Sequence, residues 1–368
     1  MKRKNTLSKQ KVSSDRGFLY VVLVLLFLGL VAVADASAPQ ALANFNDKYF
    51  FFKSQAMWAG IGLVSFFVAS KLKFTLWEKV ATPFFFFTVF LLVMVLIPAF
   101  SYSALGARRW ISIGPVNFQP TEIIKLSIAM YFAKLAKSEK GPTSYFIPLV
   151  VILGLIMLQP DLGTALSVSV VGLAQIFVSG VSLLNFFIAG VVGILGVITL
   201  ILVSPYRRDR LHTFFEITAD PLGKGYHIRQ ILLALGSGGF FGVGIGASRQ
   251  KYLFLPEAST DSIFAIIAEE LGLIGAVAII GLFAYFLYKG FKIARNAPDK
   301  FSQVLAVGLT SWIGGQAFLN IASMVALVPL TGIPLPFFSY GGSSLVMVLT
   351  ACGILLNISR YAKSERNK

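Results

Sequence analysis

Three ionisable side chains could act together in a chain that is otherwise very apolar. Glu122 and Lys125 are three residues apart, which places both side chains on one face of a helix. Asp161 lies between two apolar segments, directly after Gln159 and Pro160. A structural ion pair would also explain the first two residues, and an N-cap would explain Asp161 equally well. Spacing alone therefore leaves both the structural and the chemical interpretation open.

Four carboxylates surround the start of a later apolar segment. Glu257 and Asp261 precede this segment, and Glu269 and Glu270 lie inside it. Charged groups at membrane depth are costly, so they usually face the interior of a helix bundle or a wet cavity. Asp261 could instead cap the helix that follows it, and the two internal glutamates are interpreted as structural. One carboxylate of this set could serve as a general base.

Cationic and polar side chains occur in the same non-spanning segments. Arginine forks match phosphate oxygens, so a lipid with a pyrophosphate head group fits this pattern, and ordinary attraction to anionic lipid is the alternative. The substrate-binding candidates are Arg109, Gln119, Asp161, Arg210, Gln230, Glu257, Ser339 and Ser343.

Two segments are irregular in sequence. Pro329–Ser344 contains three prolines and three glycines, which cannot continue a helix. Irregular backbone at membrane depth is tolerated where it is buried in protein or lines a cavity, so we expect this segment to form a wall of an outward-facing cavity. The glycines of Gly236–Gly246 follow no predicted strand, which disfavours a nucleotide loop and favours close packing against another helix or a lipid head group.

The elements that position these residues must be membrane helices. Of the 368 residues, 56% are hydrophobic and 13% are charged, whereas a soluble domain normally carries about 25% charged residues. Gly17–Ala34 is already long enough to cross the hydrocarbon, and it is interpreted as a retained span rather than a cleaved signal peptide. The formal charge of +16 therefore concerns membrane topology, and no nucleic-acid partner is expected. Cys352 is alone, so no intrachain disulfide can form.

Ten transmembrane helices are predicted in an all-α integral membrane fold. They are placed near residues 17–35, 52–70, 81–100, 119–136, 144–158, 162–180, 184–203, 263–289, 302–328 and 342–359. With this count, lysine and arginine concentrate in alternate loops and in both tails, and the positive-inside rule then predicts that both termini are cytoplasmic.

The domain organisation follows from these spans. Residues 1–16 and 360–368 are basic cytoplasmic tails, and residues 17–359 form a single membrane domain. Residues 204–262 form a long extracytoplasmic loop between spans 7 and 8. Within this loop, Ile231–Phe241 is apolar but too short to span, which favours an interfacial or re-entrant helix.

Five motifs, in order along nearly the whole chain, resemble the SEDS family (shape, elongation, division and sporulation proteins). The matching stretches are ARRWISIGPVNFQPTEIIK at 107–125, QPDLGTA at 159–165, ADPLGKGYHIRQILLALGSGGFFGVGIG at 219–246, LPEASTDSIFAIIAEELGLIG at 255–275 and TGIPLPFFSYGGSS at 331–344.

The resemblance implies a ten-helix fold and glycosyltransferase activity. Members of the family polymerise lipid II, the lipid-linked disaccharide-peptide precursor, into peptidoglycan strands. They work in the bacterial cytoplasmic membrane, beside a single-pass class B penicillin-binding protein and other membrane proteins of the division machinery. The essential aspartate of the family corresponds to Asp261, and its Glu–Lys motif corresponds to Glu122 and Lys125. Support by Mg²⁺ or Mn²⁺ is also implied, although no metal-ligand cluster stands out in the sequence.

The resemblance leaves two subfamilies as candidates for this chain. The segment GVGIGASRQKYLFLPE is similar to that of the division proteins (FtsW) and favours a role at the septum over the elongation proteins (RodA). Three positions depart from the usual pattern: Thr121 replaces a serine, Ser259 a histidine and Ser262 a phenylalanine. The last two flank Asp261 and put in doubt any role for the histidine.

The resemblance leads to a mechanistic hypothesis. Asp261 would deprotonate the C4 hydroxyl of the acceptor sugar, whose oxygen attacks C1 of the donor. Undecaprenyl pyrophosphate then leaves, and inversion gives a β-1,4 bond. The Glu122–Lys125 pair would shape the cavity, and Arg210, Arg109 or a divalent cation would offset the pyrophosphate charge. The alternatives are a lipid II flippase, which needs polar groups through both leaflets, and a non-catalytic division scaffold.

Overall fold

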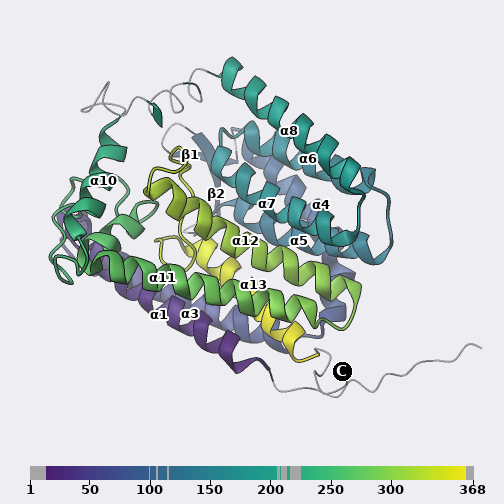
Figure 1. Ribbon diagram of the computed structural model, residues 1–368, viewed down its shortest axis with the longest axis horizontal. Coiled ribbons are helices and arrows are strands. Elements are labelled where there is room, and N and C mark those ends of the chain that lie inside the picture. Colours follow the sequence, from purple (N-terminus) through teal and green to yellow (C-terminus); the bar gives the residue numbers. More distant parts are fainter. Residues whose placement is uncertain are drawn as a thin grey trace, which may run out of the picture.

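The structure is a computed structural model that describes residues 14–98, 100–104, 107–113, 116–204, 208, 214–215 and 225–361 (Figure 1). Its helices are α1 (Arg16–Ala36), α2 (Ala38–Phe45), α3 (Phe50–Lys71), α4 (Phe74–Leu96), α5 (Pro120–Lys137), α6 (Thr143–Met157), α7 (Leu162–Ser179), α8 (Leu183–Val203), α10 (Tyr226–Gly238), α11 (Ile263–Arg295), α12 (Lys300–Met324) and α13 (Gly342–Ser359).

Each of the ten predicted spans coincides with one of these helices. Seven helices are long and apolar enough to cross a membrane, and α6 and part of α8 are shorter apolar helices. Helix α5 is outside both groups, and it contains Glu122, Lys125, Lys134 and Lys137. The largest boundary error concerns α4, which begins seven residues before the predicted residue 81. Its charged first turns extend the helix beyond its apolar part, where Glu78 pairs with Lys137 at 2.7 Å.

The helical fold agrees with the prediction, and the structure adds one short sheet between α4 and α5 that the sequence analysis does not predict. Strands β1 (Ser101–Ala104), β2 (Ala107–Ile113) and β3 (Val116–Phe118) form an antiparallel sheet in the order β1-β2-β3. The strands are short, so alternation of polar and apolar residues gives only a weak signal. The buried side chain of Ile111 packs with Leu91 and Val95 of α4, and this contact fixes the sheet on the end of the bundle.

The ends of the described chain meet at one end of the bundle. The backbone N–H of Asp15 donates to Ser359 Oγ at 3.2 Å, and Lys289 Nζ pairs with Asp15 Oδ1 at 3.0 Å. Burial acts to raise the pKa of Asp15, but the N–H of Phe18 and the ammonium of Lys289 outweigh it and lower the pKa below its usual value. We call this the terminal end. The cytoplasmic placement of both termini stays a prediction.

The opposite end, which we call the site end, begins where α1 finishes. Asp35 in the last turn of α1 pairs with Lys251, which lies in the segment before α11. Helix α1 therefore runs antiparallel to α11, with one ion pair near each of its own ends. Helix α10 and the loops that precede α11 and α13 lie at this end of the bundle (Figure 1).

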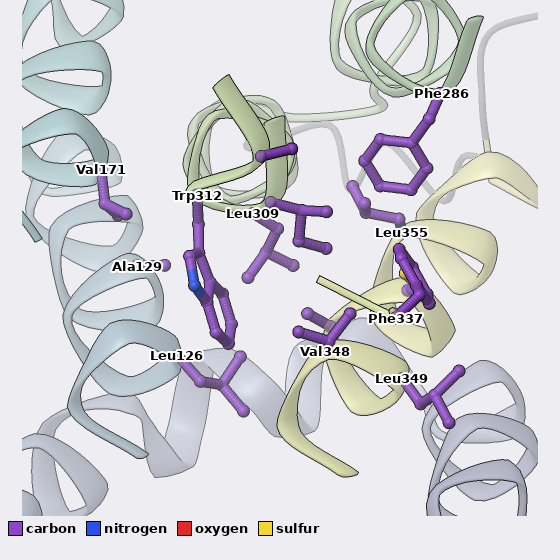
Figure 2. Close-up of a cluster of buried hydrophobic side chains, with 14 of the residues drawn as sticks. Leu126, Ala129, Val171, Phe286, Leu309, Trp312, Phe337, Val348, Leu349 and Leu355 are labelled. Atoms are coloured by element: carbon purple, nitrogen blue, oxygen red, sulfur yellow. The ribbon is translucent and has the colours of Figure 1, made fainter. Parts of the chain in front are cut away.

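The hydrophobic core lies around α12, which packs against α5, α7 and α11. The side chain of Trp312 extends from α12 toward Leu126 and Ala129 of α5 (Figure 2). On the other side, Leu355 of α13 and Phe286 of α11 lie in the same cluster. Helix α8 differs, because large apolar side chains are exposed all round it. In a bilayer these side chains would face lipid.

Helix α11 is interrupted at Gly272, whose φ of 66° and ψ of −167° are not helical. Residues 239–244 pack against the interruption and form backbone hydrogen bonds on both sides of it. Val243 N donates to Glu269 O at 3.0 Å, and Leu273 N donates to Gly239 O at 2.9 Å. The backbones approach so closely that a Cβ on Gly242 would lie 2.0 Å from Glu270 O. The glycine-rich run therefore packs against a helix, one of the two predicted roles for it, and it satisfies backbone groups that the break would leave unpaired.

Candidate functional site

Asp261 is held at the site end between the start of α11 and the loop of residues 331–341. Asn320 of α12 donates from Nδ2 to the backbone oxygens of Asp261 and Ile333, both at 2.8 Å. A Cβ added to Gly332 would lie 3.4 Å from Asp261 Oδ2, so the loop backbone passes close to the carboxylate. The carboxylate is half-buried against this irregular loop. The structure therefore brings together the carboxylate and the segment that the sequence predicts to line the same cavity.

Ser339 connects the same two segments. Its hydroxyl donates to Thr260 O at 2.7 Å and accepts a hydrogen bond of 2.7 Å from the backbone N–H of Leu335. One residue later, Tyr340 N donates to Ser259 O at 2.8 Å. Ser339 is predicted to bind substrate, but its hydroxyl is engaged in holding the loop beside Asp261.

Glu122 and Lys125 form the predicted ion pair on α5. Lys125 Nζ lies 2.7 Å from Glu122 Oε1, and both side chains are buried. Lys125 Nζ also donates to Gln316 Oε1 of α12 at 2.9 Å and lies 5.1 Å from the ring centroid of Trp312. Glu122 Oε2 has no hydrogen-bond partner among the described residues. The pair is thus part of the protein interior, and Gln316 and Trp312 are its contacts with α12.

Arg109, Gln119 and Asp161 form a second polar group beside the sheet. Arg109 donates from Nε to Gln159 O at 3.1 Å and from Nη2 to Pro160 O at 2.5 Å. Gln119 Nε2 lies 3.4 Å from Asp161 Oδ2.

Asp161 has the geometry of the capping alternative. It caps α7, because its Oδ1 accepts the N–H of Thr164 at 3.0 Å and its Oδ2 accepts the Thr164 hydroxyl at 2.8 Å.

The other predicted site residues are less closely tied to Asp261. Glu257 is exposed and accepts the Thr260 hydroxyl at 2.7 Å. Gln230 lies half-buried on α10, and Ser343 lies half-buried in the first turn of α13. Arg210 lies outside the described residues.

Three residues near Asp261 are missed by the sequence analysis as site residues. Gln316 and Asn320 are one turn apart on α12, inside a predicted apolar span. Buried amides in such a span are costly unless they are hydrogen-bonded, so the argument applied to charged residues would also have found these two. The third is His227 of α10, whose Nε2 lies 2.8 Å from the hydroxyl of Ser262.

A separate buried cluster surrounds Lys251. Its ammonium lies 2.7 Å from Asp35 Oδ1 and 2.8 Å from Glu270 Oε1. Burial lowers the pKa of Lys251, but the hydrogen bonds to these two carboxylates outweigh this effect, and the net pKa is raised above 10.5. Glu269 beside it accepts the backbone N–H groups of Arg249 and Gln250. Both glutamates, which the sequence analysis interprets as structural, thus bond to the segment Ser248–Lys251.

The residues at the site end have the components for acid–base chemistry on a polar lipid head group. Asp261 is a half-buried carboxylate on a segment that accepts hydrogen bonds from Asn320, Ser339 and Tyr340. In the described part of the chain, no three His, Cys, Asp or Glu side chains are grouped to hold a metal ion.

These features define a polytopic membrane protein with a polar site at one end of its helix bundle. The chain matches the family model of the FtsW, RodA and SpoVE cell cycle proteins over residues 15–364. It belongs to this family, the SEDS family of membrane proteins.

Individual relatives cover nearly the whole chain. Stage V sporulation protein E of Bacillus subtilis is 41% identical over 365 residues, which are 97% of this chain and 100% of the relative. A probable peptidoglycan glycosyltransferase FtsW of Trichlorobacter lovleyi is 39% identical and covers 95% of this chain and 94% of its own length.

Solved structures share the fold. The rod shape determining protein RodA of Thermus thermophilus has a TM-score of 0.71 at 27% identity, over 96% of this chain and 99% of the other. A chain from a study of the structural coordination of polymerization and crosslinking by a peptidoglycan synthase complex has a TM-score of 0.78 at 27% identity, over 95% of this chain and 98% of that one.

Proposed function

We propose that this protein is a peptidoglycan glycosyltransferase that polymerises lipid II into β-1,4 glycan strands at the outer face of the bacterial cytoplasmic membrane. The observation that carries the proposal is Asp261. Its carboxylate lies at the site end, half-buried beside Gly332, on a segment that Asn320 and Ser339 fix in place. Similarity to relatives named probable peptidoglycan glycosyltransferase supports the reaction class.

In the proposed reaction Asp261 acts as the general base. It accepts the proton of the acceptor sugar's C4 hydroxyl, and that oxygen forms the new bond to C1 of the donor sugar. The bond between C1 and the pyrophosphate oxygen breaks, and undecaprenyl pyrophosphate leaves with the electron pair. Attack from the opposite face converts the α-linked donor to a β-linked product.

The charge of the leaving pyrophosphate needs a cationic partner. Arg109 already donates to two backbone oxygens, but a guanidinium has five N–H donors, so further donors remain for an anion. Arg210 and a divalent cation are the other candidates carried over from the sequence. Assays in Mg²⁺, Mn²⁺ and chelator separate the contribution of a metal from that of arginine.

The biological setting belongs to the same proposal. The similarity to FtsW and to stage V sporulation protein E favours septal or spore-wall synthesis over elongation, with RodA-type elongation as the alternative. The proposed partners are a class B penicillin-binding protein, other divisome membrane proteins and the surrounding lipids. The structural match to a chain of a peptidoglycan synthase complex supports the first of these partners.

The test is polymerisation of labelled lipid II by purified protein, with and without the penicillin-binding protein. Wild type should give a ladder of glycan polymers on a gel, and Asp261→Asn, which keeps the shape but removes the basicity, should give none. Polymer formation by Asp261→Asn would refute the base assignment. If wild type gives no polymer while vesicle assays show exchange of lipid II between leaflets, the flippase alternative is correct.

A further inference from the structure

The two amides on α12 connect the buried ion pair of α5 with the segment that holds Asp261. Gln316 and Asn320 are four residues apart, so their side chains lie on one face of α12. Gln316 contacts Lys125, and Asn320 contacts Asp261. Gln316 thus bonds the ion pair to the 331–341 loop at Pro334, and Asn320 bonds the preceding residue of that loop, Ile333, to the backbone of Asp261.

The orientation of each amide is determined by its partners. Lys125 Nζ and Trp312 Nε1 can only donate, and both lie 2.9 Å from Gln316 Oε1. Gln316 Nε2 must then face the other way, where it donates to Pro334 O at 2.9 Å. A rotated amide would place N–H against N–H and lose all three bonds.

Asn320 makes the same kind of contact at the site. Both partners of its Nδ2 are backbone carbonyls, so both N–H groups are used. One carbonyl belongs to Asp261 and the other to Ile333, which follows Gly332. Asn320 Nδ2 binds both segments of the site. This nitrogen therefore sets the separation between the backbone of Asp261 and the loop against which the Asp261 carboxylate lies.

We infer that Asn320 and Gln316 are positioning residues, which fix Asp261 relative to the 331–341 loop and transmit the position of the Glu122–Lys125 pair to it. This inference rests on the proposed function. Neither amide is required to contact substrate. A misplacement of about 1 Å can reduce catalysis about 100-fold, which is the size of effect that loss of these bonds should produce.

The test is the isosteric variant Asn320→Asp, which replaces the two donors by a carboxylate that repels both carbonyls. The chain offers matched controls. Gln175 is also buried and donates from Nε2 to Ala129 O and Val304 O, at 2.8 and 3.0 Å, and Asn357 is buried and donates to Ser70 O at 2.7 Å. Gln175→Glu and Asn357→Asp thus introduce the same chemical change away from the site.

All variants are assayed by initial rates of lipid II polymerisation, normalised to folded, monodisperse protein, with Tm measured in parallel. We expect kcat to fall about 100-fold in Asn320→Asp with KM within about 3-fold, and to stay within about 3-fold of wild type in both controls. Gln316→Leu should show a smaller loss of the same kind. If Asn320→Asp does not fold, Asn320→Leu, which removes the donors without adding charge, takes its place.

A second measurement separates positioning from a general loss of structure. Residues that act as a unit are non-additive, so Gln316→Leu should cause little further loss of activity in an Asn320→Asp background, which retains measurable polymerisation. A fully additive loss there, or equal losses in the controls, would overturn the inference while wild-type polymerisation still supports the proposed function. Wild type without polymerase activity would overturn both.

Discussion

Lys125 and Lys251 are both buried lysines paired with glutamates, but their surroundings differ. Lys125 pairs with a glutamate one turn away on the same helix, and Gln316 connects it to the loop beside Asp261. Lys251 lies between α1 and α11 and pairs with Asp35 and Glu270. The Lys125 pair therefore borders the proposed site, whereas the Lys251 cluster joins separate parts of the chain.

The carboxylates around Lys125 and Lys251, which we call the first and the second cluster, also differ in the hydrogen bonds that they accept. Glu122 Oε2 is buried without a hydrogen-bond partner among the described residues. Glu269 and Glu270 instead accept backbone N–H groups from the segment Ser248–Gln250. The Glu122–Lys125 pair also connects through Gln316 to Pro334 in the loop beside Asp261. We therefore expect the first cluster to control activity and the second to control stability.

The largest expected effect on the second cluster comes from a substitution that changes the backbone beside it. Gly272→Ala should prevent folding, because φ of 66° with ψ of −167° is accessible almost only to glycine, and a Cβ there would lie 2.3 Å from Gly242 N. The expected cost exceeds about 3 kcal/mol. Yield of monodisperse protein and Tm are the measurements. Gly281→Ala, where a Cβ meets no atom within 4 Å, is the control and should behave like wild type.

Removal of one glutamate charge from each cluster tests the comparison between the two clusters directly. Glu270→Gln removes one partner of a buried lysine and should destabilise the protein by about 3 kcal/mol, with specific activity of the folded fraction within about 2-fold. Glu122→Gln should lower the specific activity by about 10-fold or more, because Lys125 then loses the charge that holds it toward Gln316. Tm and initial rates are measured on both proteins. Equal activity in the two variants would remove the distinction between the clusters.

The smallest expected effect is at alkaline pH. The pKa of Lys251 is raised in the folded protein, so its contribution to stability is complete below about 10.5 and is lost as pH rises through the folded value. Wild type should therefore lose Tm more steeply than Lys251→Met above about pH 10.5. The exposed pair Lys53–Asp47 supplies the control, and Lys53→Met should leave the wild-type slope unchanged. Parallel slopes for wild type and Lys251→Met would contradict the prediction.

Much of the helical framework could be predicted because hydrocarbon imposes long apolar segments on the sequence. Even the polar α5 coincides with a predicted span. The sheet could not be predicted in this way, because its strands are three to seven residues long and are held by contacts with α4. Short strands depend on tertiary context more than on local pattern.

For the site, motif resemblance selected Asp261, Glu122 and Lys125, and the structure gives their surroundings. The sequence could not show that Asp161 is a cap or that Ser339 joins two loops, because both facts depend on partners brought together by folding. Asn320 and Gln316 were missed for a different reason. They are neutral amides inside a predicted span, where charged side chains stand out, although burial is costly for amides as well.

The break in α11 also limits how the chain can vary in length. Residues 239–244 belong to no helix or strand, and loops of this kind usually tolerate insertions. Here each of four consecutive pairings depends on register: Val243 with Glu269, Gly244 with Glu270, Leu273 with Gly239 and Ile274 with Phe240. One inserted residue would shift these partners and leave peptide groups unpaired beside the bilayer. Homologues should therefore keep the length from Gly239 to Gly244 constant while nearby surface loops vary.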